Sequence, residues 1–182
     1  MRHLFVALLL FSLARAADYY PHAVGTTWRY TSGEVQSITG KRTLGGVEVY
    51  ELEHRYPEGG RMVEVMSYDR GVRLLAVRTG GRVLAYDPPL LLFPSPPLKK
   101  GQSWAQETRL NGQRLNVRYR VLGIEGVRVP LGAYNAFKIR SLMVGPSGSE
   151  NEVILYFVPG LGVVRYATPD GGVIDLEAFS RP

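Results

Sequence analysis

The chain has 182 residues, carries a formal net charge of +6 at pH 7 and contains no cysteine. The lack of cysteine excludes a disulfide framework, a thiolate metal site and a cysteine nucleophile. The length is enough for one domain of ordinary size with its own hydrophobic core.

The first sixteen residues, Met1–Ala16, have the layout of a secretory signal peptide. Arg2 gives a basic start, Leu4 to Leu13 form an apolar core, and Ala14-Arg15-Ala16 is a small-x-small cleavage site. We expect cleavage after Ala16 and export to the periplasm or cell surface of a bacterium. No later segment approaches the roughly 18 apolar residues of a membrane helix, so the mature chain is predicted not to be transmembrane.

After Trp28 and Tyr30, which alternate into a first strand, short β-branched and aromatic runs are separated by glycine-containing turns. Paired glycines such as Gly45-Gly46 and Gly80-Gly81 supply the positive φ of tight hairpins, and this spacing predicts an antiparallel meander. Late in the chain, two apolar runs flank Pro159-Gly160-Leu161-Gly162. The expected strands are Val35 to Thr43, Val47 to Tyr56, Arg61 to Tyr68, Val72 to Arg78, Arg82 to Tyr86, Ala105 to Leu110, Arg114 to Leu122, Gly132 to Val144, Val153 to Val158, Val163 to Tyr166 and Val173 to Phe179.

The segment from Asp87 to Lys100 interrupts this rhythm with five prolines around an apolar run. Proline cannot donate to a ladder, so we expect this segment to stay out of the middle of a sheet and to cross between two halves. Gly101-Gln102-Ser103-Trp104 then repeats the glycine-to-tryptophan spacing of Gly25-Thr26-Thr27-Trp28. The sequence therefore predicts one all-β domain over 17–182, with homologous meanders at 17–86 and 101–182 joined by 87–100, and a curved antiparallel sheet that forms a half-barrel or a sandwich.

Five cationic side chains alternate with apolar ones on two neighbouring strands. If these strands pair as a hairpin through Gly123 to Gly132, the five share one surface, where they either bind an anionic ligand or form an ordinary solvent face. They are Arg114, Arg118, Arg120, Lys138 and Arg140.

The sequence offers little for catalysis. His22 and His54 are the histidines outside the leader, and neither has a metal-ligand spacing. Glu51, Glu53 and Glu64 are predicted to lie on an exposed strand face. We therefore expect no enzyme activity, no metal and no cofactor.

Three motifs carry a resemblance to a known group: Tyr20-Pro21-x-x-x-Gly25-x-x-Trp28, Val129-Pro130-Leu131-Gly132-Ala133-Tyr134, and Tyr156-Phe157-Val158-Pro159-Gly160-Leu161-Gly162. They resemble a loose group of uncharacterised bacterial exported β-rich envelope proteins, a domain of unknown function. That group is similar to the half-barrels of periplasmic lipoprotein carriers. The resemblance implies a concave apolar face that holds an acyl chain.

The favoured hypothesis is a non-enzymatic cell-envelope protein whose curved sheet binds a hydrophobic or anionic ligand. In its mechanism the concave apolar face takes a hydrophobic group while the five cations meet an anion. The alternative is a structural subunit that joins an envelope protein assembly by strand pairing. A lipid or anionic envelope ligand, or an envelope protein, is the expected partner, and nucleic acid is not.

Overall fold

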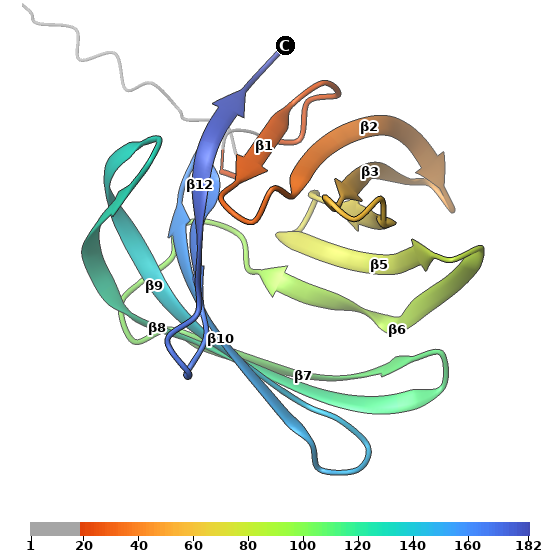
Figure 1. The fold of residues 1–182 in the computed structure, drawn as a ribbon. Helices are drawn as coiled ribbons and strands as arrows, with labels where there is room; N and C mark the ends of the chain where they lie inside the picture. The colour runs from red at the N-terminus through yellow and green to blue at the C-terminus, as the bar shows by residue number, and fades with distance from the viewer. Residues whose placement is uncertain (1–18) are drawn as a thin grey trace, which may run out of the picture.

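The computed structural model describes residues 19–182, so the predicted signal peptide lies outside the described residues. This part of the chain is antiparallel β-structure throughout, which confirms the all-β prediction (Figure 1). Across residues 19–182, no helix has the length and apolar character needed to cross a membrane. The strands are β1 (Thr27–Tyr30), β2 (Val35–Leu44), β3 (Val47–Arg55), β4 (Arg61–Ser67), β5 (Val72–Thr79), β6 (Arg82–Phe93), β7 (Ser103–Leu110), β8 (Gln113–Val129), β9 (Gly132–Val144), β10 (Glu150–Val158), β11 (Gly162–Ala167) and β12 (Val173–Ser180).

The described strands form a closed barrel rather than the half-barrel or sandwich that the sequence predicts. Each strand is antiparallel to its neighbours in sequence. The ring closes because β1 pairs with β2 on one side and with β12 on the other, where Thr27 lies opposite Ser180. Figure 1 shows β12 lying beside β1. The β1–β12 pair joins the two ends of the domain, so no turn motif in the sequence predicts it.

The seam between β6 and β7 is held mainly by side chains. Backbone pairing is limited to Tyr86 with Leu110 and Asp87 with Arg109, because Pro88 and Pro89 follow and have no N–H to donate. Three alternate side chains of β7 then reach the backbone of β6. The Thr108 hydroxyl donates to Pro88 O (2.6 Å), Gln106 donates to Pro89 O and accepts from Leu91 N (both 2.9 Å), and Trp104 Nε1 donates to Leu91 O (3.3 Å).

This seam corrects the prediction that the proline-rich segment stays out of the sheet. Its first part, up to Phe93, belongs to β6 and pairs with β5, where Leu90 lies opposite Leu74. The prolines are tolerated because hydroxyl, amide and indole groups of β7 replace the missing backbone bonds on the other side.

The hairpin of β8 and β9 is longer than expected. A turn was predicted from Gly123 to Gly132, but the ladder continues through a bulge after Val121 until Val129 faces Gly132. β7 accompanies β8 only up to Arg120, so the far half of this hairpin projects beyond β7 and curls towards β12, where Leu131 N donates to Leu176 O. Ile124, on the projecting half, is 62% exposed.

Aromatic side chains close one end of the barrel. Tyr20 is buried and packs on Trp28, Tyr68, Phe93 and Phe157, with ring centroids 5.8 to 6.1 Å apart. Backbone contacts fix this plug, since Gly160 N donates to Tyr19 O at 3.0 Å and Trp28 Nε1 donates to Leu161 O at 2.7 Å. The segment before β1 therefore seals the end formed by the β10–β11 turn.

The two tryptophans that the sequence aligns occupy corresponding places in the element order. Trp28 lies in β1 and Trp104 in β7, the first strands of two successive runs of six. Trp28 is fully buried, whereas Trp104 is half-buried and stacks on Tyr119 with centroids 5.0 Å apart. Internal duplication is compatible with this order and stays a prediction.

Candidate functional site in the barrel interior

The barrel encloses a cavity of about 450 Å³. Eight strands make a barrel just wide enough for side chains to fill, so this larger ring leaves room inside it. The volume falls within the roughly 300–1,000 Å³ of small-molecule sites. The lining is mainly apolar and aromatic: Tyr20, Leu52, Tyr56, Met62, Met66, Leu92, Phe93, Tyr119, Val153, Leu155, Val163, Tyr166 and Ile174. Four of its polar members gather on one wall, at β2 to β4, and two lie elsewhere: Glu34, Gln36, His54 and Glu64 on that wall, with Ser141 in β9 and Thr168 after β11.

The cavity runs along the barrel axis from the plugged end. Tyr20 and Phe93, both part of the plug, form its floor. Glu34, Tyr56 and Thr168 lie at the opposite end, beside the β1–β2, β3–β4 and β11–β12 turns. A ligand would therefore enter from the end that the plug leaves free.

Strand alternation places the polar wall of the cavity. In β3 the side chains of Leu52 and His54 point inwards, and His54 lies opposite Gln36 of β2 and Met62 of β4. Glu64 lies opposite Leu52, so it also points inwards.

This register corrects the prediction that three glutamates share an exposed face. Glu51 and Glu53 lie opposite Val65 and Val63, on the outer face, where Glu53 is paired with Arg55 and Arg61. Glu64 lies between Val63 and Val65 in β4, so its side chain points to the opposite face and projects into the barrel.

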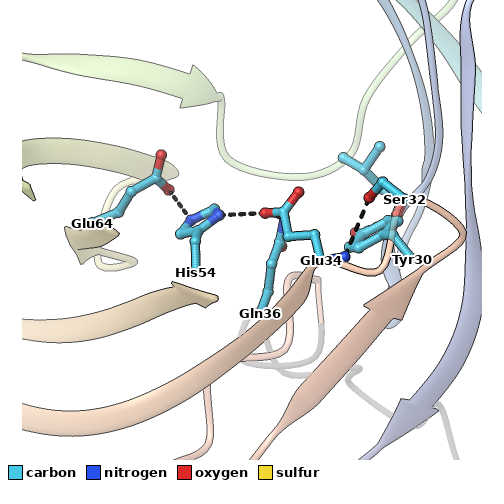
Figure 2. A network of polar contacts seen from close by, with 7 residues as sticks. Tyr30, Ser32, Glu34, Gln36, His54 and Glu64 are labelled. Atoms are coloured by element: carbon cyan, nitrogen blue, oxygen red, sulfur yellow. Dashed lines mark hydrogen bonds and ion pairs between the residues drawn. The ribbon is translucent and has the colours of Figure 1, made fainter. Parts of the chain in front are cut away.

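His54 lies between two carboxylates (Figure 2). Its Nδ1 is 2.7 Å from Glu34 Oε1, which also accepts from Gln36 Nε2 at 3.0 Å. Its Nε2 is 3.5 Å from Glu64 Oε2, and no hydrogen bond to Nε2 is formed within residues 19–182. The His54 side chain is 9% exposed, against 17% for Glu34 and 19% for Glu64.

This arrangement fixes the charge of the imidazole. Burial alone would lower the pKa of His54, but the hydrogen bond with Glu34 and the negative charges of Glu34 and Glu64 outweigh it and raise the pKa to about 9. Burial raises the pKa of Glu34, and its hydrogen bonds from His54 and Gln36 more than reverse this, so the net shift is downwards. At neutral pH the cluster therefore holds an imidazolium between carboxylates.

The apolar run that the sequence singled out, Val153 to Val158, is used on both faces. Val153 and Leu155 line the cavity. Tyr156 faces outwards and is nevertheless buried, because Lys138 and Arg165 lie over its ring with charges 5.6 and 5.9 Å from the centroid. Cationic side chains thus cover Tyr156 on the outer face of this run.

Three of the five predicted cations meet on the outer wall. Tyr119 lines the cavity, so its neighbours Arg118 and Arg120 point outwards, and Arg140 lies directly opposite Arg120. They surround a depression of about 390 Å³ whose floor includes the small residues Ser103 and Ala105. Within residues 19–182 neither Arg118 nor Arg120 has an acidic partner, whereas Arg140 pairs with Glu152.

The other two predicted cations lie outside this depression. Arg114 pairs with Glu107, and Lys138 pairs with Glu125 at 2.9 Å while covering Tyr156. The wall of the barrel separates all five from the cavity. The predicted mechanism, in which one ligand meets the apolar concave face and the cations together, is therefore replaced by two separate candidate sites.

The cluster of Glu34, His54 and Glu64 was missed by reasoning from sequence. Its signal was present as alternation, because His54 continues the inward series of Tyr50 and Leu52, and Glu64 stands between Met62 and Met66. Glu34 precedes β2 and depends on the tertiary structure to reach His54. In the described part of the chain, no group of three or more histidine, aspartate or glutamate side chains is placed to hold a metal ion.

Comparison with known proteins adds little to this geometry. No family model matches the chain, and no curated protein matches it. Two solved structures described as "putative" proteins resemble it at 13% identity. One is a lipoprotein from Parabacteroides distasonis ATCC 8503, with a TM-score of 0.47; the match covers 89% of this chain and 98% of that one. The other is an exported protein with a YmcC-like fold from Bacteroides fragilis NCTC 9343, with a TM-score of 0.45; the match covers 90% of this chain and 99% of that one. Likenesses at this level carry no inference about what the chain does.

Proposed function

We propose that the chain is an exported, non-enzymatic protein of the bacterial cell envelope that binds a small hydrophobic ligand inside its barrel. The observation that carries the proposal is the cavity of about 450 Å³, lined mainly by apolar and aromatic side chains, with most of its polar groups on one wall. Pockets of this composition are typical of small-molecule sites. Export rests on the signal-peptide pattern of Met1–Ala16.

The state of His54 argues against a role as general base. A general base must have a free lone pair near neutral pH, and efficient ones have a pKa close to the working pH. The pKa of His54 is about 9 and both ring nitrogens face carboxylates, so the imidazole is protonated and has no free lone pair at neutral pH.

Filling the cavity tests the proposal. Binding of the apolar fluorophore N-phenyl-1-naphthylamine to the mature protein is expected to fall at least tenfold in Leu155→Trp, because the indole would occupy the ligand's volume. Val83→Trp, at a position 62% exposed, is the matched control and should bind as the wild type does. Absence of binding to the wild type, or undiminished binding to Leu155→Trp, would refute an interior site.

Native mass spectrometry supplies an independent test with the natural ligand. Protein purified from its own envelope without added ligand is expected to carry a lipid-sized mass on a monomer. A ligand-free oligomer, or a stable complex with another envelope protein, would favour a structural subunit instead.

A second candidate function, anion binding on the outer wall, is favoured by the unpaired Arg118 and Arg120. Like charges on neighbouring strands repel, so a site that keeps Arg120 opposite Arg140 without neutralising both is suited to an external anion. Sedimentation with phosphatidylglycerol vesicles is expected to decrease in the triple variant Arg118→Ser, Arg120→Ser, Arg140→Ser. Arg82→Ser, at the exposed start of β6, removes one positive charge elsewhere on the surface and serves as the control, and equal sedimentation of all three proteins would exclude this site.

The alternative of a structural subunit has less geometric support. Joining an assembly by strand pairing requires a free strand edge, and the closed order of the described strands gives each of them two neighbours. Such pairing would need a stretch that a neighbouring strand does not accompany, such as the part of β8 beyond Arg120.

A further inference from the structure

The polar wall of the cavity has a charge that restricts the ligand. His54 supplies one positive charge and Glu34 and Glu64 supply two carboxylates, so the three groups sum to one net negative charge at neutral pH. A net charge in an apolar interior is costly unless a counter-charge accompanies it. Within residues 19–182, no arginine or lysine pairs with Glu34 or Glu64, and both carboxyl groups pair with His54.

Glu64 is the member of the cluster with unused capacity for a ligand. Glu34 Oε1 already accepts hydrogen bonds from His54 and Gln36. Glu64 forms no hydrogen bond within the described residues and approaches His54 only at 3.5 Å, while the buried Nε2 of His54 beside it also lacks a hydrogen-bond partner. Both groups line the cavity, so the polar wall is incompletely satisfied where a ligand head group would lie.

The surroundings of Glu64 suit a cation. Tyr20, Tyr56 and Tyr166 line the same cavity, and aromatic rings attract ammonium groups through their negative faces. Leu52, Met62 and Leu155 provide apolar surface for the rest of the molecule. A carboxylate head group would instead meet two like charges and one opposite charge, so its net interaction with this wall is unfavourable.

We propose that the barrel interior selects amphiphiles with an ammonium head group, which Glu64 binds beside His54 while the apolar wall holds the alkyl chain. This inference rests on the proposed function and specifies its ligand class. The ammonium neutralises the net negative charge of the polar wall, which a neutral or anionic head group does not do.

Three probes of equal chain length test the head group: decylamine, decanol and decanoate, each titrated calorimetrically into the mature protein at pH 7. Decylamine is expected to bind at least tenfold more tightly than decanoate, with decanol between them. Glu64→Gln should weaken decylamine about tenfold and leave decanol unchanged. Glu58→Gln, on the exposed β3–β4 turn, removes the same charge from the surface and should preserve the preference.

The outcomes separate the two proposals. Binding of decanol and decanoate as tightly as decylamine, or an unchanged amine preference in Glu64→Gln, would overturn the ammonium inference and leave the interior site standing. Failure of all three probes to bind would overturn the interior site as well. Because the wild-type ratio of decylamine to decanoate affinity is itself decisive, the test does not depend on the folding of a variant.

Discussion

His54 affects the stability of the fold, the charge of the cavity wall and the choice of ligand. A histidine whose folded-state pKa is raised above its unfolded value of about 6.5 stabilises the fold fully below that value, and this contribution disappears as pH rises through the folded pKa of about 9. The difference between the two values corresponds to roughly 3 kcal/mol, at about 1.4 kcal/mol per pKa unit.

We therefore predict that the free energy of unfolding of the wild type falls by roughly 3 kcal/mol between pH 6 and pH 9.5, and that His54→Gln removes most of this slope. Urea unfolding at a series of pH values measures it. The range stops below pH 10, because burial raises the pKa of tyrosines such as Tyr20, whose ionisation in the unfolded state destabilises the fold at higher pH. A wild-type slope retained in His54→Gln would assign it to something other than the cluster.

At the scale of elements, strands that are local in sequence could be predicted and pairings that are not local could not. Glycine turns and alternation predicted each strand of the described chain, since both signals act over short stretches, but β6 and β8 continue well beyond the ends expected at Tyr86 and Leu122. Barrel closure depends on β1 meeting β12, and the inward position of Glu64 depends on the register of β4 against β3. The cations were identified by alternation as one surface, but their ion pairs with Glu107, Glu125 and Glu152 come from neighbouring strands.

The β6–β7 seam yields a prediction about a single glutamine. Gln106→Ala removes two hydrogen bonds and leaves Leu91 N and Pro89 O without these partners, so it should destabilise the protein by about 1–3 kcal/mol. Chemical denaturation measures the loss, and hydrogen exchange should show faster exchange of the Leu91 amide. Gln113→Ala, exposed at the start of β8, is expected to stay within about 0.5 kcal/mol of the wild type. Equal stability of the two variants would mean that the seam does not depend on this side chain.

At the scale of the whole molecule, the aromatic plug closes one end of the barrel and leaves the other end open. Tyr20 forms both the floor of the cavity and the centre of the plug, so its ring links the stability of the barrel to retention of a ligand.

Tyr20→Ala is expected to cost about 3–5 kcal/mol, as for other large aromatic deletions in a core, and to speed ligand release by opening the second end. Thermal unfolding and stopped-flow dissociation of N-phenyl-1-naphthylamine measure the two effects. Tyr134→Ala, on the half-buried part of β9 outside the cavity, should cost less and leave the dissociation rate unchanged. If Tyr20→Ala lost stability but did not release the fluorophore faster, the plug would not be what retains the ligand.

The pairing of β1 with β12 also means that the barrel can close only late in folding. Arg29 and Glu177, which form an ion pair at 3.0 Å across this junction, are 148 positions apart in the chain. β1 emerges early during synthesis and lacks its second neighbour until β12 has followed it. Contacts between residues so far apart in sequence make folding slow, because the chain must lose the entropy of closing a long loop before these contacts can stabilise it. A chain threaded across a membrane from its first residue would therefore remain unclosed, and able to pass, until almost all of it had arrived.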